Sequence, residues 1–164
     1  MRVDLIAPTD HVYAMLTAGE RAPPFEGTTG EGKPFHLAEL SGHPVVLYFF
    51  PKAGTYGCTR ESMEFAHHYE QFRAKGAAVV GVSVDTVESQ HEFGSECHLP
   101  FPLVADPEKR VAKLYGVLGA FGYARRVTFL IAADGRIAEV VASSLPTAHV
   151  RRSLEFLSAG PTGT

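Results

Sequence analysis

The chain has 164 residues, of which 45% are hydrophobic and 20% charged, with a formal net charge of −3 at pH 7. These values are typical of one domain whose core is large enough to fold without disulfides or metals. Lys and Arg form no long run, which argues against a nucleic-acid or anionic membrane partner. No apolar stretch approaches the roughly twenty residues of a membrane helix, and residues 1–20 do not resemble a signal peptide. We therefore expect a cytoplasmic protein that binds neither nucleic acid nor a membrane.

Potential metal and nucleotide ligands are sparse. Cys58 and Cys97 are too few for a disulfide scaffold or a thiolate-rich zinc site. The histidines are scattered, and the adjacent pair His67-His68 cannot chelate one ion from one helix face. The glycines at 54 and 57 are not followed by the Lys-Ser/Thr of a phosphate-binding loop. We expect no metal and no cofactor, so the two cysteines are either inert core residues or redox groups.

The first predicted elements are a hairpin and a buried strand. Residues 22–25 and the turn at 30–33 indicate a short hairpin whose second strand is 34–37, and one helical turn follows at 38–40. Residues 45–50 are β-branched or aromatic, as in a strand buried on both faces.

Helices and strands then alternate. From Cys58, apolar residues return at helical spacing, which predicts one helix closed by Gly76. Asp85 and Glu88 resemble a capping box at the start of the next helix. The later predicted elements are a buried strand at 77–84, a helix at 85–96, a proline-flanked strand at 100–105 suited to an edge or a strand entrance, a helix from Asp106-Pro107 to about 114, a hairpin at 127–133 and 136–142 around Asp134-Gly135, and a helix at 147–158.

This order predicts an α/β fold in which helices flank a mixed central sheet. We expect an N-terminal extension at residues 1–17, one domain at 18–160 and a frayed tail at 161–164.

Cys58 follows the strand at 45–50 and begins a predicted helix. Free N–H groups and the positive end of the helix dipole stabilise an anion there, which favours a reactive thiolate. The alternative is a buried, inert thiol.

Pro51, Thr55 and Cys58 form a pattern of a proline, three residues, a threonine, two residues and a cysteine. It resembles the active-site signature of the peroxiredoxins, and most closely the peroxiredoxin Q, or bacterioferritin comigratory protein, subgroup of this AhpC/TSA-like family. The likeness extends from about Ala18 to the final helix, and it includes segments at 19–25, 81–85, 99–106 and 126–131. It implies a thioredoxin-like fold with an N-terminal hairpin extension, and a thiol-dependent peroxidase acting on hydrogen peroxide or organic hydroperoxides.

The resemblance assigns roles around Cys58. Cys58 would attack the peroxide as a thiolate and become a sulfenic acid. Thr55 would hydrogen bond with the peroxide and the thiolate through its hydroxyl, unless it is an ordinary turn or N-cap residue. Pro51 would fix the turn and shield the sulfur without offering a competing N–H.

Two charged residues complete the implied site. Arg126 would stabilise the thiolate and the charge that develops as the O–O bond breaks. Arg125 and Arg126 face opposite sides of a strand, and the Arg-x-Thr-Phe spacing selects Arg126. Glu61 lies one helical turn after Cys58 and would orient Arg126, or it is a glutamate favoured by the helix dipole.

The sequence departs from the family at the resolving cysteine. The position five residues after Cys58 is Met63, and the alternative position on the next helix is Gly94. Cys97 lies one turn beyond Gly94 and could occupy a similar face. We expect Cys97 to form a disulfide with Cys58 after local unwinding of the helix ends. The rival is a one-cysteine cycle with an external thiol.

Other functions fit less well. A disulfide reductase or a copper carrier would need paired cysteines, which the segment around Cys58 lacks. A non-catalytic binding or chaperone domain remains an alternative. Phe49, Phe50 and Tyr56 are compatible with bulky hydroperoxides, although they would also suit a core or a rim. Expected partners are a peroxide and a thioredoxin-like or low-molecular-weight thiol reductant, with the chain a monomer or weak homodimer.

Overall fold

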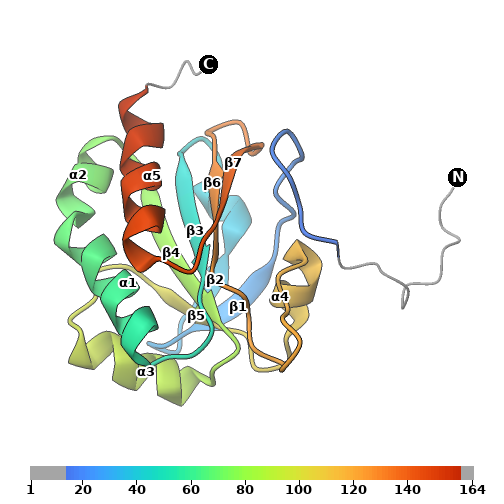
Figure 1. Cartoon of the computed structure of the whole chain (residues 1–164), viewed down its shortest axis with the longest axis vertical. Helices are drawn as coiled ribbons and strands as arrows, with labels where there is room; N and C mark the ends of the chain where they lie inside the picture. Colours follow the sequence, from blue (N-terminus) through green and yellow to red (C-terminus); the bar gives the residue numbers. More distant parts are fainter. Residues whose placement is uncertain (1–13, 160–164) are drawn as a thin grey trace, which may run out of the picture.

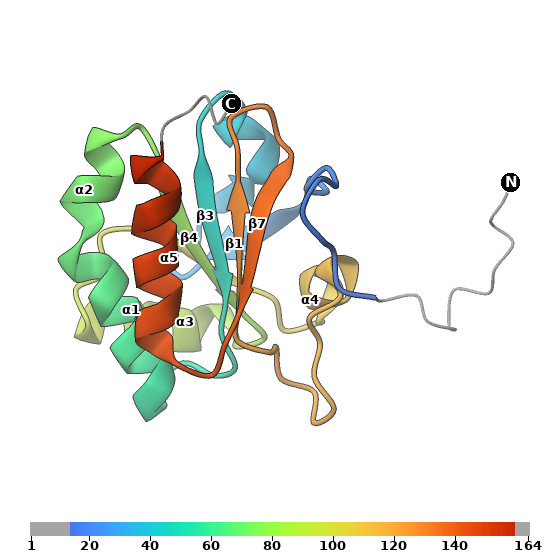
Figure 2. The ribbon, with the colours of Figure 1, turned by 45° about the horizontal axis from the view of Figure 1, so that its top comes forward.

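The computed structural model describes residues 14–159, which form a seven-stranded sheet between two layers (Figures 1 and 2). The strands are β1 (Glu26–Thr29), β2 (Pro34–His36), β3 (Val45–Phe49), β4 (Ala78–Ser83), β5 (Leu103–Ala105), β6 (Val127–Ile131) and β7 (Ile137–Ala142). The helices are α1 (Tyr56–His67), α2 (Tyr69–Ala74), α3 (Val87–Glu96), α4 (Arg110–Tyr115) and α5 (Pro146–Ser158), with a 3-10 helix η2 (Leu37–Leu40).

The sheet is mixed, as predicted. Its strand order is β2-β1-β5-β4-β3-β6-β7. Strand β4 pairs in parallel with β3 and with β5. All the other strand pairs in the sheet are antiparallel. Figure 2 shows α1, α2 and α5 on one face and α4 on the other. The α/β fold with a mixed sheet and an N-terminal hairpin is confirmed.

The central strand β3 is buried on both faces because each face has its own hydrophobic cluster. Leu47 and Phe49 belong to the cluster on the α4 side, whereas Val46 and Tyr48 belong to the cluster under α1, α2 and α5. Side chains alternate across a strand, so one apolar run supplies both clusters. Cys58 lies in the second cluster, which fixes its side of the sheet.

The helix predicted from Cys58 to Gly76 is two helices, because the chain turns at His68. His68 has φ −100° and ψ 9°, outside the α-helical geometry, and its ring contacts Gln71 Nε2 at 3.0 Å. The turn is compatible with burial of both Phe65 and Phe72, whose ring centroids lie 5.8 Å apart. The prediction for Gly76 is confirmed: its φ of 74° and the N–H donations at 76 and 77 form a Schellman motif after α2.

Two other predicted details are wrong, and one alternative of a third is confirmed. The N-cap of α3 is Thr86, whose hydroxyl accepts from Ser89 N–H at 3.1 Å, and the Asp85 side chain does not cap this helix. The helix expected from Asp106 begins at Arg110, because the Asp106 carboxylate accepts from the N–H groups of residues 111 and 112. Of the two alternatives for the proline-flanked strand, the strand entrance is confirmed, because the prolines at 100 and 102 precede β5, and the edge is not, because β5 lies between β1 and β4.

The predicted terminal segments are described in part. Residues 14–17 pack on the end of α4, where Leu16 N–H donates to the Tyr115 carbonyl at 3.3 Å. Residues 1–13 and the predicted tail at 161–164 lie outside the described residues, so the boundaries at 17 and 160 stay predictions. None of the helices within residues 14–159 has the length and apolar character needed to cross a membrane.

Candidate active site

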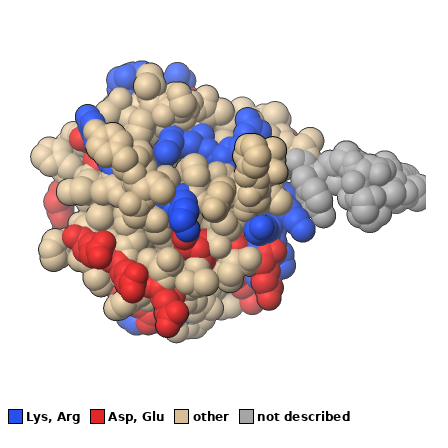
Figure 3. Space-filling model, turned by 60° about the horizontal axis from the view of Figure 1, so that its bottom comes forward, with Lys and Arg blue, Asp and Glu red and all other residues tan. Residues whose placement is uncertain are grey.

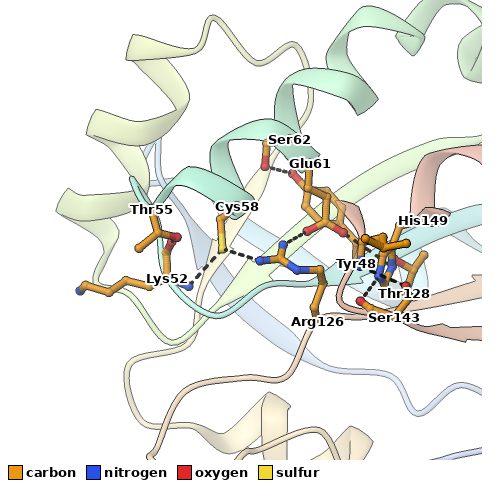
Figure 4. Close-up of polar contacts among 11 residues, drawn as sticks. Tyr48, Lys52, Thr55, Cys58, Glu61, Ser62, Arg126, Thr128, Ser143 and His149 are labelled. Carbon is orange, nitrogen blue, oxygen red and sulfur yellow. Dashed lines mark hydrogen bonds and ion pairs between the residues drawn. The ribbon is translucent and has the colours of Figure 1, made fainter. Parts of the chain in front are cut away.

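The Cys58 side chain lies in the first turn of α1, and it has no exposed surface. Its sulfur faces two N–H donors (Figure 4). The Lys52 backbone N–H lies 3.5 Å from Sγ, and Nη2 of Arg126 lies 3.6 Å from it. Two donors, one of them cationic, together with the helix N-terminus, form an environment that stabilises a thiolate.

The loop between β3 and α1 holds the Lys52 N–H in place. Asp85 anchors this loop: its Oδ2 accepts from Ala53 N–H at 2.8 Å and from the Ser83 hydroxyl at 2.6 Å. Lys52 Nζ lies 3.8 Å from the other carboxylate oxygen. Asp85 therefore ties the loop beside Cys58 to the end of β4. Sequence reasoning assigned it to a helix cap and missed this role.

Thr55 and Pro51 lie in the same loop. Thr55 is the N-cap residue of α1, but its hydroxyl makes no cap hydrogen bond and donates to the Lys52 carbonyl at 2.7 Å. This bond leaves the oxygen lone pairs available to accept a hydrogen bond from another molecule. Pro51 directly precedes Lys52, so it sets the backbone from which the N–H reaches Cys58.

Arg126 and Glu61 lie together beside Cys58. Nη1 of Arg126 donates to Oε1 of Glu61 at 2.6 Å while Nη2 faces the sulfur (Figure 4). Arg125 is exposed and Arg126 is partly buried, but both precede β6, so the strand on which the alternation was predicted does not include them. Burial raises the pKa of Glu61 to about 8, although Arg126 acts to lower it.

Behind Glu61 lies a residue that sequence reasoning missed. Glu61 and His149 are both fully buried, and Oε2 of Glu61 lies 3.6 Å from Nδ1 of His149. Nδ1 also lies 2.8 Å from the Thr128 hydroxyl, and Nε2 lies 2.8 Å from the Ser143 carbonyl. His149 comes from α5, and no local signal connects it with α1.

Cys97 caps the C-terminal end of α3 and packs against the same hydrophobic cluster as Cys58. Both cysteines are free thiols. Burial raises the pKa of Cys97, and the Glu96 carboxylate raises it further. The following residue, His98, has a left-handed φ of 52°. The two cysteines thus lie on one side of the sheet, but no bond joins them.

The aromatic residues considered for substrate binding are divided between core and surface. Phe49 and Phe50 are fully buried, whereas Tyr56 is 81% exposed. Tyr56 and Met63 line a shallow surface depression of about 450 Å³ on α1. Figure 3 shows the face at the lower end of Figure 1, where basic and acidic side chains both occur and neither covers the surface.

Within residues 14–159, no three His, Cys, Asp or Glu side chains are grouped so that they could hold a metal ion. The chemistry that the site itself supports is that of a thiolate beside a fixed cation. Such a site can attack an electrophilic oxygen and stabilise the charge that leaves.

Comparisons with known proteins agree with this geometry. The family model described as AhpC/TSA matches residues 18–140. The chain belongs to the AhpC/TSA family. A chloroplastic peroxiredoxin Q of Sedum lineare is 36% identical over 151 residues, covering 90% of this chain and 81% of the relative. A putative peroxiredoxin bcp of Coxiella burnetii is 37% identical over 132 residues, covering 76% of this chain and 87% of the relative.

Solved structures place this peroxiredoxin in the same group. The peroxidoxin BcpB of Mycobacterium tuberculosis superposes with a TM-score of 0.83 at 33% identity, covering 88% of this chain and 97% of that one. A Xanthomonas campestris peroxiredoxin Q gives 0.80 at 28% identity, covering 88% and 98%. The thioredoxin-like fold and the resemblance to peroxiredoxin Q and bacterioferritin comigratory protein are confirmed, and the protein is a thiol-dependent peroxidase.

Proposed function

We propose that Cys58 is the peroxidatic cysteine of this peroxidase. The observation that carries the assignment is the pair of donors on its sulfur, the Lys52 N–H at 3.5 Å and Arg126 Nη2 at 3.6 Å. Cys97 has neither feature, because it lies at the C-terminal end of a helix next to a carboxylate. The negative end of a helix dipole disfavours a thiolate there.

The first step is nucleophilic. The Cys58 thiolate attacks the terminal oxygen of a hydroperoxide, so that an S–O bond forms and the O–O bond breaks. The cysteine becomes a sulfenic acid, and the alkoxide or hydroxide that leaves takes up a proton to become an alcohol or water. Arg126 stabilises the negative charge as it moves from sulfur to the leaving oxygen. Thr55 accepts a hydrogen bond from the peroxide O–H, and Glu61 orients Arg126.

Access to Cys58 requires motion of the loop or of the first turn of α1. The side chain has no exposed surface in this conformation. The loop is held mainly by the bond from Ala53 N–H to Asp85 and by the bond from the Thr55 hydroxyl to the Lys52 carbonyl. Breaking a few such bonds is a local opening rather than global unfolding.

We further propose that Cys97 resolves the sulfenic acid. Its thiol attacks Cys58 sulfur, and the products are a Cys58–Cys97 disulfide and one water. The last turn of α3 must open, which breaks the bonds from Cys97 N–H to the Phe93 carbonyl at 3.1 Å and from Leu99 N–H to the Gly94 carbonyl at 3.0 Å. A surface depression of about 460 Å³ borders this turn and offers space into which it can open.

The remaining steps involve partners. A thioredoxin-like or low-molecular-weight thiol reduces the disulfide, and the substrates are hydrogen peroxide and organic hydroperoxides. A similar solved structure is that of the Xanthomonas campestris bacterioferritin comigratory protein, which is described as having alkyl peroxide reduction activity, and this supports the organic class. We propose a monomer or weak homodimer. A cytoplasmic location stays a prediction, since the relatives include both chloroplastic and bacterial proteins.

The test compares Cys58→Ser with Cys97→Ser. With a dithiol reductant, we expect the wild-type chain and Cys97→Ser to consume peroxide and Cys58→Ser to consume none. After one equivalent of peroxide, intact-mass analysis should show loss of two hydrogen atoms in the wild type and gain of one oxygen atom in Cys97→Ser. Peroxide consumption by Cys58→Ser would sink the assignment of the peroxidatic cysteine. A persistent sulfenic acid in the wild type would instead support the one-cysteine cycle.

A further inference from the structure

A buried acid and a buried base face each other behind Arg126. Glu61 and His149, here called the buried pair, have no exposed side-chain surface. Oε2 of Glu61 has no hydrogen-bond partner among the described residues, and Nδ1 of His149 lies 3.6 Å from it. An unpartnered buried carboxylate oxygen is costly, so this atom calls for a physical explanation.

The hydrogen bonds of His149 determine its neutral tautomer. The Ser143 carbonyl at 2.8 Å from Nε2 can only accept, so Nε2 carries the proton. Nδ1 of the neutral ring is then an acceptor, and the Thr128 hydroxyl at 2.8 Å donates to it. With Glu61 ionised, Oε2 and Nδ1 are two acceptors that face each other without a proton between them.

One added proton satisfies both atoms once they close from 3.6 Å to hydrogen-bond distance. It resides either on Oε2, donating to Nδ1 in place of the Thr128 hydroxyl, or on Nδ1, donating to Oε2, in which case the Thr128 hydroxyl rotates to accept. Burial favours the state in which the pair holds this single proton, because it raises the pKa of Glu61 to about 8 and lowers the pKa of His149. The buried pair has no net charge with the proton and one negative charge without it.

We propose that His149 is a positioning residue of the peroxidase site: with Glu61 it holds one shared proton, whose presence determines how strongly the positive charge of Arg126 acts on Cys58. The inference rests on the proposed role of Cys58. When the proton leaves, the Glu61 carboxylate competes more strongly for Arg126, whose Nη1 it already contacts at 2.6 Å. The thiolate at the other end of the guanidinium, 3.6 Å from Nη2, is then less stabilised.

The buried pair has few other electrostatic neighbours. The titratable groups that act on it or are affected by it are Arg126, which precedes β6, and Tyr48 on β3, and Arg126 in turn interacts with Cys58 on α1. Burial raises the pKa of Tyr48 well above its ordinary value, so Tyr48 remains neutral. Two uncharged groups also face the buried pair: the Thr128 hydroxyl from β6 and the Ser143 carbonyl from the segment after β7. Arg126 is therefore the route by which the pair and the thiol affect each other.

The first experiment measures thiolate formation at Cys58 against pH, by ultraviolet absorbance and by the rate of alkylation, in a Cys97→Ser background. His149→Gln removes the Nδ1 acceptor, while its amide can still donate to the Ser143 carbonyl. We expect Glu61 to ionise more readily, thiolate formation to move to higher pH and alkylation near neutral pH to slow by about fivefold. His36→Gln is the matched control, because it removes an exposed His–Glu contact of 3.8 Å.

A double-mutant cycle separates coupling from a structural effect. In a Glu61→Gln background, which has no proton to share, His149→Gln should leave thiolate formation unchanged. Equal effects of His149→Gln with and without Glu61 would overturn the proposal. A thiolate titration of His149→Gln that superimposes on that of the control would also overturn it.

A second measurement needs no change to the buried pair. Nitrogen-15 spectra of the His149 ring in the otherwise native chain should show a pH-dependent change at Nδ1, with Nε2 protonated throughout. Because coupling is reciprocal, Cys58→Ser should move this change to lower pH by removing the thiolate charge. An unmoved midpoint would refute the coupling. Neither experiment uses peroxide turnover, so failure of the coupling and failure of the proposed peroxidase chemistry at Cys58 are distinguishable.

Discussion

A Cβ atom on Gly57 would lie 2.9 Å from Nη2 of Arg126, closer than Cβ contacts in proteins. Arg126 cannot retreat easily, because its Nη1 is held by Glu61 at 2.6 Å. Glycine at this helical position therefore provides the space in which the guanidinium reaches the Cys58 sulfur. The residue before the cysteine is part of the site, although it has no side chain.

We expect Gly57→Ala to slow the reaction of Cys58 with peroxide by about tenfold or more, because Arg126 is displaced. Stability should not fall in parallel, since alanine favours a helix over glycine by roughly 0.5–1 kcal/mol. Stopped-flow peroxide kinetics and chemical unfolding measure the two effects. Gly94→Ala is the control: it is also helical, but its nearest neighbour, Leu103 Cδ1, would be 3.7 Å away. Wild-type kinetics in Gly57→Ala would contradict the steric argument.

Arg126→Lys tests whether the fork of the guanidinium matters. One guanidinium contacts the Cys58 sulfur through Nη2 and Glu61 through Nη1, and a single ammonium cannot reproduce this planar arrangement. We expect kcat/KM for peroxide to fall by about 100-fold. Arg125→Lys changes the adjacent, exposed arginine and should leave kcat/KM unchanged. Equal losses in the two variants would show that the effect is not specific to the site.

Local patterns predicted the part of the site that lies within one segment or follows from residue spacing. Pro51, Thr55 and Cys58 are close in sequence, and the Arg-x-Thr-Phe spacing separates Arg126 from Arg125, although both residues precede β6. The hairpins and the buried strands followed from turn residues and apolar runs in the same way.

Contacts between distant segments were not predictable. Asp85 has the sequence signature of a helix cap, but Ala53 N–H and the Ser83 hydroxyl recruit its carboxylate, and Thr86 caps α3 instead. His149 meets Glu61 because α5 packs on α1, a tertiary contact without a local signal. The break at His68 accompanies the packing of α1 and α2 on the core, which overrides the continuous helical spacing of the sequence.

Asp85→Asn tests the anchor of the active-site loop. The amide carbonyl oxygen can replace Oδ2 and accept from both Ala53 N–H and the Ser83 hydroxyl, but as a neutral acceptor it holds them less strongly, and the contact of the other oxygen with Lys52 Nζ is lost. We expect the loop to open more often and alkylation of buried Cys58 by a bulky reagent to accelerate several-fold. The free energy of unfolding should fall by about 1–3 kcal/mol. Asp134→Asn, in the β6–β7 turn, is the control. Slower alkylation in Asp85→Asn would contradict the anchoring role.

Resolution by Cys97 should accelerate as the pH rises. Burial, and then Glu96, raise the pKa of Cys97, so little of the nucleophilic thiolate is present at neutral pH. Rapid-quench measurement of disulfide formation after a peroxide pulse should show the rate rising through the alkaline range. Glu96→Gln should increase the rate at neutral pH, whereas Glu92→Gln, an exposed glutamate one turn earlier on α3, should have a smaller effect. A rate independent of pH would indicate that opening of α3, not ionisation of Cys97, limits resolution.

The buried pair should make stability depend on pH in a defined window. The ordinary pKa values are 4.5 for Glu61 and 6.5 for His149, and in the folded chain the first is raised to about 8 while the second is lowered. Between pH 4.5 and 6.5, the folded and unfolded pairs each hold about one proton, on Glu61 and on His149 respectively. Between pH 6.5 and about 8, the folded pair keeps its proton and the unfolded pair has lost it.

The free energy of unfolding should therefore fall as the pH rises through this upper window, by at most about 1.4 kcal/mol per pH unit. Below pH 4.5 the sign reverses, because the unfolded pair takes up a second proton that the folded pair resists. Urea unfolding at stepped pH measures both slopes. The double variant Glu61→Gln with His149→Gln lacks the pair, and its difference from the wild type isolates the effect from other titrations. If that difference does not change between pH 6.5 and 8, Glu61 is already ionised in the folded chain and the shared proton is absent.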